Sequence, residues 1–303
     1  MKTCPEPTGE VRPLPEVRLS VELLRQADSR AQLGESPVWD PATDDIWWVD
    51  IDSRKLLRTR LGSGSVDIWN TPEIPGFVVL TASERPAIGM QTGIFAFDPA
   101  TSAFERIVGL DMQGHRFNDA TVDAHGRLWT STMALDARPG SAAIHRVADR
   151  LVRVVGGLAI PNGLAVDLVR GRLFYSDSHP DIQRIWIRPV QPVSAMAGEP
   201  TLFSTTHVLK GRPDGAALDE RGHYWIAGVD GAGLYVFDRH GRLETEIQVP
   251  FPAPTKLCFT GTQARALAIT SKGIGEDGGY LALADLPETF APGTTQPYWT
   301  GTA

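Results

Sequence analysis

One pattern of residues recurs along the chain, and its period limits the folds that the sequence can adopt. Each copy has a short apolar run, an Asp followed by a polar turn, and a second run rich in aromatic and branched residues. Two such runs joined by a few turn residues are typical of a β-hairpin. The clearest copies are GESPVWDPATDDIWWVDI (34–51), FNDATVDAHGRLWTSTM (117–133), IPNGLAVDLVRGRLFYSDS (160–178) and RPDGAALDERGHYWIAGV (212–229).

The spacing of these copies predicts a propeller. A weaker copy at 77–98 fills the long interval between the first two clear copies, and another at 254–270 follows the last. Six units therefore recur every 40–50 residues or so, which is close to the period of four-stranded propeller blades. We predict an all-β fold, a six-bladed β-propeller with four-stranded antiparallel blades. A pair of β-sandwiches is the alternative, which the period disfavours.

The repeats also suggest where the domain begins. Residues 1–18 hold four prolines and are predicted to be an extended N-terminal tail. Residues 19–303 are predicted to form the propeller as a single catalytic domain. The segment LSVELLRQ (19–26) is predicted to supply the outer strand that closes the ring with the C-terminal strands.

Charge and hydropathy exclude several classes of partner. The formal net charge is −7, whereas proteins that bind nucleic acids rely on basic patches. No run approaches the ~20 apolar residues that a transmembrane helix needs, and the N-terminus lacks the apolar stretch of a signal peptide. We therefore expect a cytoplasmic protein that binds neither nucleic acid nor membrane. The two cysteines, Cys4 and Cys258, are not expected to form a disulfide.

Four polar residues stand at the same phase of the repeat, immediately before the first strand of a unit: Glu35, Asn118, Asn162 and Asp214. The first strand of a propeller blade lies nearest the central channel, so these side chains are predicted to meet at one mouth of it. Two carboxylates and amide oxygens suit a divalent cation such as Ca²⁺, Mg²⁺, Mn²⁺, Fe²⁺ or Zn²⁺. The alternative is that each residue only caps a turn.

Other polar and aromatic residues near these motifs receive simpler interpretations. Asp177 ends a predicted strand, and we favour a solvated strand end over a position beside Asp214 or Asn162. His115 and His179 are placed to line the rim of the channel. The blade tryptophans are expected to pack in the core between blades: Trp47, Trp48, Trp129 and Trp225.

Four motifs in this order resemble the gluconolactonase/regucalcin (senescence marker protein) family: GESPVWD, RFNDATVDAHGRLWTSTM, IPNGLAVD and RPDGAALDERGHYWIA. The resemblance runs from about Gly34 to the C-terminus. It implies a six-bladed propeller with one catalytic divalent metal ion at the channel mouth. It also implies hydrolysis of sugar lactones, a reaction of many family members.

The resemblance assigns roles to individual residues of this chain. Glu35, Asn162 and Asp214 would bind the metal, and Asp214 would also act as general base or acid. Arg116 and Asn118 would bind the substrate, with Asn118 near the metal. Asp136 of STMALD matches a carboxylate that contacts sugar hydroxyls in the family, where the longer Glu often stands.

The leading functional hypothesis is metal-dependent hydrolysis of an aldonolactone to the aldonic acid. A phosphotriester or aryl-ester hydrolase on the same propeller is one alternative, because a polarising metal serves both reactions. A non-catalytic propeller that binds calcium or a sugar is another. The sequence leaves open the sugar, the native metal and whether the protein is a monomer or a homodimer.

Overall fold

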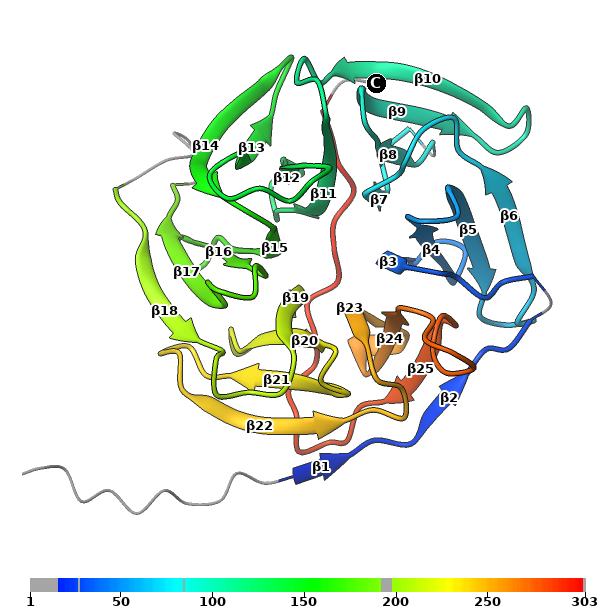
Figure 1. The fold of residues 1–303 in the computed structure, drawn as a ribbon. Helices are drawn as coiled ribbons and strands as arrows, with labels where there is room; N and C mark the ends of the chain where they lie inside the picture. Colours follow the sequence, from blue (N-terminus) through cyan, green and yellow to red (C-terminus); the bar gives the residue numbers. More distant parts are fainter. Residues whose placement is uncertain (1–15, 27, 84, 192–197, 302–303) are drawn as a thin grey trace, which may run out of the picture.

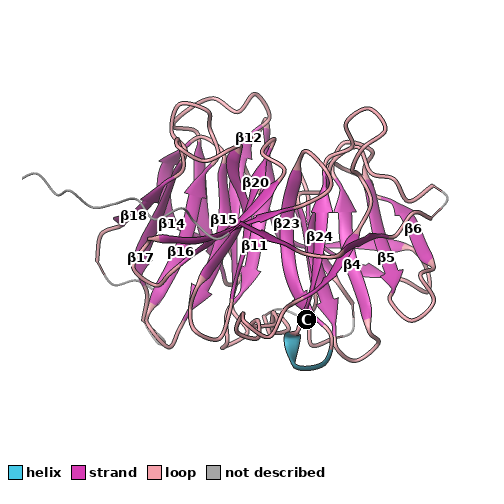
Figure 2. Cartoon of the chain, turned by 90° about the horizontal axis from the view of Figure 1, so that it is seen from below, coloured by secondary structure: helices cyan, strands magenta, loops and turns pink. Residues whose placement is uncertain are grey.

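The structure is a computed structural model that describes residues 16–26, 28–83, 85–191 and 198–301. Six sheets, each with four antiparallel strands, stand as blades around a central channel (Figure 1). Figure 2 shows the same ring from the side, with the strands of neighbouring blades standing next to one another. The predicted six-bladed propeller is confirmed.

In blades 1 to 5 four strands follow the chain from the channel outward, and the first strands of neighbouring blades around the ring contact one another. Blades 1 to 3 contain β3 (Gly34–Asp40), β4 (Asp45–Asp50), β5 (Lys55–Arg60), β6 (Val66–Asn70), β7 (Phe77–Val79), β8 (Ala87–Gly89), β9 (Gly93–Asp98), β10 (Ala103–Gly109), β11 (His115–Val122), β12 (Leu128–Ala134), β13 (Ala142–Val147) and β14 (Leu151–Leu158).

The second half of the ring repeats this order. Blades 4 to 6 contain β15 (Pro161–Asp167), β16 (Arg172–Asp177), β17 (Arg184–Pro189), β18 (Thr201–Thr205), β19 (Arg212–Leu218), β20 (Tyr224–Val229), β21 (Gly233–Phe237), β22 (Leu243–Gln248), β23 (Pro254–Thr260), β24 (Ala266–Ser271) and β25 (Ala282–Asp285), with one 3₁₀ turn, η1 (Thr262–Ala264). Across the described ranges, no helix has the length and apolar character to span a membrane.

The ring is closed by strands from the two ends of the sequence. β2 (Val21–Leu23) pairs antiparallel with β25 and so becomes the outermost strand of blade 6. This confirms the closing strand predicted within 19–26. β1 (Glu16–Arg18) adds to blade 5 by parallel pairing with β22. The rest of the predicted tail, residues 1–15, lies outside the described residues.

The blades are held together by large side chains between their faces. Trp48, Trp129 and Trp225 are each at most 1% exposed. Trp225 of blade 5 packs edge-to-face on Phe259 of blade 6, with ring centroids 5.5 Å apart. Aromatic pairs of this kind add to the free energy gained by burying apolar surface. The predicted packing role of the blade tryptophans is confirmed.

A C-terminal segment, Pro292–Thr300, crosses the ring, and we call it the strap (Figure 1, red). The amide of Thr294 donates to the carbonyl of Leu218 at the end of β19, with an N···O distance of 2.9 Å. Farther along, the amide of Trp299 donates to the carbonyl of Leu80, 2.8 Å away, next to blade 2. These contacts lie at the C-terminal ends of the inner strands. The strap therefore covers the channel mouth opposite the predicted site residues.

Candidate functional site

The inner strands that carry the predicted site residues are interrupted by a β-bulge beside each of those residues. The register of β3 against β4 shifts directly after Glu35, and that of β15 against β16 shifts directly after Asn162. β11 and β19 show the same shift around Asn118 and Asp214. A bulge bends the strand and re-aims its side chains. Four blades therefore direct a polar residue toward the same end of the channel.

A chain of amide and hydroxyl hydrogen bonds fixes the orientation of Asn162. The side-chain nitrogen of Asn118 donates to Oδ1 of Asn162 (2.8 Å) and to the carbonyl of Pro161 (3.1 Å). Asn162 donates in turn to Oγ of Ser178 (2.9 Å), which donates to the carbonyl of Pro213. These bonds join blades 3, 4 and 5. They hold both amides buried, at 9% and 7% exposure.

The two carboxylates of the site are poorly compensated. Burial raises the pKa of Glu35 to about 7, against the opposing charge of Lys256. Burial also raises the pKa of Asp214 well above its usual value, and the charges of Glu35 and Asp119 add to this effect. Glu35 accepts a bond from the amide of Ser36 (2.8 Å), but no described residue donates to the Asp214 carboxylate. The effect of the Glu35 charge on the pKa of Asp214 indicates that two negative charges converge here.

Arg116 is the buried cation beside these carboxylates. Its Nη1 donates to Oδ1 of Asn118 and to the carbonyl of Phe117, both at 2.8 Å. Burial lowers its pKa to about 10, whereas the charges of Glu35 and Asp214 act in the opposite direction. The guanidinium therefore remains charged at neutral pH. Its hydrogen bonds to the described residues use only Nη1, so Nη2 can donate to a ligand.

The donor set fits a hard divalent cation. Glu35 and Asp214 offer carboxylate oxygens, and Asn162 offers an amide oxygen that the Asn118 hydrogen bond holds in place. Within the described ranges, no group of three or more His, Cys, Asp and Glu side chains is arranged to bind a metal. A metal bound by Glu35, Asp214 and Asn162 would have oxygen ligands carrying two negative charges, as calcium and magnesium sites often do. A cation would also offset the cost of burying these two carboxylates, which is the main cause of both raised pKa values.

Asp136 lies apart from this cluster. It follows β12 in an exposed turn, and its carboxylate is 3.5 Å from Nη1 of Arg138. The amide of Leu135 donates to the carbonyl of Gly114, so the turn stands beside the start of β11, at the same mouth as Arg116. The Asp136 side chain is 62% exposed. Contact with a substrate hydroxyl stays a prediction for this residue.

Our interpretation of Asp177 as a solvated strand end was wrong. Its side chain is fully buried and accepts hydrogen bonds from the amides of Ala159 (2.8 Å) and Ile160 (3.0 Å). Asp50 does the same in blade 1, where it accepts bonds from the two residues before Gly34, Gln32 and Leu33, each at 3.0 Å. Both carboxylates hold the backbone that leads into an inner strand. By fixing this backbone, Asp177 helps to position Asn162, and Asp50 helps to position Glu35.

Two charged residues beneath the site were not singled out from the sequence. Asp119 follows Asn118 in RFND, and Lys256 stands in the apolar run PTKLCF. Both are buried, and Nζ of Lys256 is 2.5 Å from Oδ1 of Asp119. A lysine inside an apolar inner strand was the signal that could have revealed them, because buried lysines are rare unless paired.

Comparisons with known proteins agree with this architecture. The family model described as SMP-30/Gluconolactonase/LRE-like region matches residues 33–273. A 6-deoxy-6-sulfogluconolactonase from Pseudomonas putida is 31% identical over 281 residues, which cover 89% of this chain and 95% of that protein. A pentonolactonase from Haloferax volcanii is 28% identical over 263 residues, covering 84% and 87%. A solved structure of a calcium-binding protein, regucalcin, from Agrobacterium tumefaciens has a TM-score of 0.86 at 24% identity, covers 94% of this chain and 98% of that one, and shares the fold.

The raised pKa of Glu35 predicts a pH-dependent stability for protein freed of divalent ions by a chelator. The carboxyl keeps its proton up to about pH 7 in the folded state but ionises near 4.5 when unfolded. The unfolded state therefore binds fewer protons between these values, and the free energy of unfolding falls as the pH rises through this window. Urea titrations at pH 5 to 8 should show a smaller fall for Glu35→Gln than for the parent. Equal slopes would contradict the burial of this charge.

The matched control is Glu22→Gln on the exposed face of β2. It removes the same charge far from the channel, and its slope should follow that of the parent protein.

Proposed function

Because this chain belongs to the SMP-30/gluconolactonase/LRE-like family, we propose that it hydrolyses a sugar lactone with the help of one divalent cation. The observation that carries the proposal is the convergence of Glu35, Asp214 and Asn162 beside a buried arginine. Relatives named as lactonases support the reaction class. The product is the aldonic acid.

Glu35, Asn162 and Asp214 would hold the cation. When bound, it supplies the positive charge that polarises a lactone carbonyl and stabilises the developing oxyanion. Oxygen ligands do not select strongly among Ca²⁺, Mn²⁺, Mg²⁺, Fe²⁺ and Zn²⁺. The native ion is then set by availability and by the number of ligands at the site.

The remaining steps belong to side chains. Asp214 accepts the proton of the attacking water and returns it to the ring oxygen as the ester bond breaks. Nη2 of Arg116 donates to hydroxyl or ring oxygens of the sugar. Asn118 holds the side chains of Arg116 and Asn162 in fixed positions through a hydrogen bond to each. Asp136 at the rim would accept a bond from a sugar hydroxyl.

The test of the proposal is lactone turnover with defined metal content. The protein is treated exhaustively with chelator, and a panel of aldonolactones is followed by acid release. We expect chelation to remove activity and at least two of the five ions to restore it. Full activity of metal-free protein would contradict the metal site. Faster turnover of a phosphotriester or aryl ester would favour the alternative hydrolase, and metal or sugar binding without any turnover would favour a binding protein.

Asp214→Asn should reduce kcat by a factor of a thousand or so, in the range that removal of a general base and a metal ligand produces. An amide cannot accept the proton of water, although it keeps the size of the side chain. Circular dichroism should show an unchanged fold. Asp149→Asn is the matched control, because Asp149 lies in an exposed turn outside the site. Activity within tenfold of the parent would disprove the proton-transfer role of Asp214.

Arg116→Ala should raise KM for a polyhydroxylated lactone more than for an unsubstituted lactone of the same ring size. The lost guanidinium donors contact oxygens that only the sugar carries, and loss of such binding appears mainly in KM. Steady-state kinetics on the two substrates measure the difference. Equal changes would show that Arg116 acts on the ring ester common to both, or only supports Asn118.

A further inference from the structure

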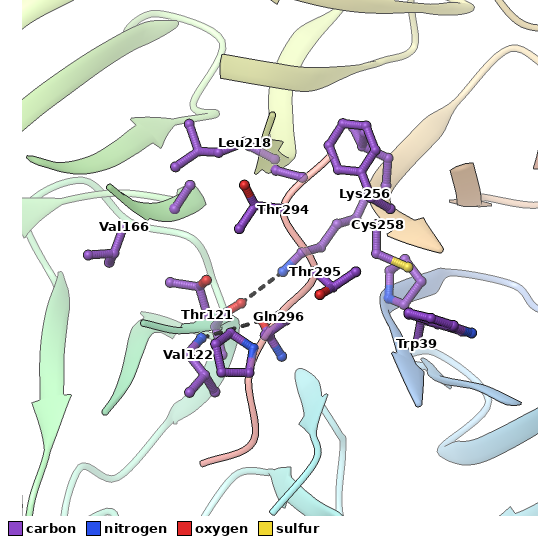
Figure 3. Close-up of a pocket in the computed structure, with 18 of the residues that line it drawn as sticks. Trp39, Thr121, Val122, Val166, Leu218, Lys256, Cys258, Thr294, Thr295 and Gln296 are labelled. Carbon is purple, nitrogen blue, oxygen red and sulfur yellow. Dashed lines mark hydrogen bonds between the residues drawn. The ribbon is translucent and has the colours of Figure 1, made fainter. Parts of the chain in front are cut away.

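A buried ion pair forms a second layer in the channel, directly beneath the site residues. Asp119 follows Asn118 on β11, and Lys256 stands on β23 of blade 6. The side chains are 3% and 7% exposed, and Nζ of Lys256 also donates to the carbonyl of Ala120 (2.9 Å). Figure 3 shows Lys256 reaching from its strand toward β11, at the edge of a channel cavity of about 100 Å³ that the strap helps to line.

The Asp119 carboxylate connects three blades. Its Oδ1 accepts bonds from the amide of Ala120 (2.8 Å) and from Lys256, and its Oδ2 accepts one from the amide of Leu164 (2.7 Å). Ala120 and Leu164 each lie two residues after a site asparagine. The carboxylate therefore holds the two bulges that present Asn118 and Asn162.

The stem of Lys256 contacts the strand that carries Asp214. A Cβ at Gly215 would lie 2.3 to 2.7 Å from Cβ, Cγ and Cδ of Lys256, which is too close for any side chain. Glycine at this position thus lets the lysine pass beneath Asp214 and reach Asp119. The residues that follow Asn118 and Asp214 thus both take part in forming or accommodating this ion pair.

The pair also keeps the electrostatics of the site in balance. Without Lys256, Asp119 would be a third buried carboxylate close to Glu35 and Asp214, whose pKa values its charge already raises. Paired, the two residues contribute no net charge. The site then presents two carboxylates to a cation, beside Arg116.

We propose that Lys256 is a positioning residue for the lactonase site: it anchors Asp119 beneath the channel mouth and so fixes the bulges that carry Asn118 and Asn162, while its stem packs against the strand that carries Asp214. This inference rests on the proposed function for its catalytic readout. It assigns Lys256 no contact with substrate or metal.

The decisive variant is Asp119→Asn/Lys256→Met, which removes both charges and leaves the net charge of the protein unchanged. Lys256→Met alone leaves the buried Asp119 carboxylate without its cation and should lower the melting temperature. The double variant should recover most of that loss. If the pair positions the site, the double variant should still have a kcat at least tenfold below the parent. Calorimetry with Mn²⁺ on chelated protein should show at least tenfold weaker binding, an effect that charge cannot explain.

Recovery of kcat and of Mn²⁺ affinity together with stability would overturn the inference, because the pair would then be structural only. Amide hydrogen exchange gives a readout that needs neither metal nor substrate. Segments 117–120 and 162–165 should exchange faster in the double variant at equal global stability, and unchanged exchange would also overturn the inference. A parent protein that turns over no lactone would refute the proposed function but would leave the exchange and calorimetric tests intact.

Two further variants complete the design. Lys272→Met replaces an exposed lysine of the same blade and should match the parent in every measurement. Should the double variant fail to fold, Lys256→Gln keeps a donor for the carbonyl of Ala120 while removing the charge. A folded Lys256→Gln protein with the parent's kcat and Mn²⁺ affinity would equally refute the positioning role.

Discussion

The site depends on the β-bulge near the start of the inner strands. In a regular strand, consecutive side chains point to opposite faces, so one strand could direct only alternate residues toward the channel. The bulge in β11 breaks this alternation, and both Asn118 and Asp119 bond to partners in other blades. The inner strands therefore present two layers of polar groups, the upper one at the mouth and the lower one beneath it.

These two layers have opposite electrostatic characters. The upper layer holds Glu35 and Asp214, and the charge of Glu35 raises the pKa of Asp214, so this layer suits an exchangeable cation. In the lower layer, Lys256 and Asp119 neutralise each other permanently. A buried ion pair costs desolvation energy and is weak evidence of added stability. Its position beneath the site is better explained by the fixed backbone geometry that it gives to the bulges of Asn118 and Asn162.

The sequence predicted the fold well because the information was local. Each hairpin has its own apolar runs and turn, the period sets the number of blades, and the closing strand within 19–26 is itself β-competent. The residues at the channel mouth share one phase of the repeat, but the prediction that each precedes an inner strand was wrong, because all four lie within those strands, next to the bulge. Their roles toward metal and substrate came from the family resemblance and from oxygen-ligand chemistry rather than from local pattern.

What the sequence did not reveal depends on contacts between blades. Asp119 and Lys256 are 137 residues apart, and only closure of the ring brings them together. Asp177 was misread because the ends of strands are usually exposed. Its carboxylate turns inward to bind the amides of Ala159 and Ile160, a geometry that no strand pattern encodes.

The strap makes the two ends of the channel differ, because it covers only one of them. Because Pro292–Thr300 covers one mouth, we expect a substrate to reach the polar layers from the other. That open mouth is bordered by the turn that carries Asp136, which is exposed, whereas the layers beneath are buried and mutually bonded. Exposed turns tolerate substitution far better than a buried polar network does. Selection among lactones is therefore expected to reside in the rim, and the chemistry in the layers that the bulges hold.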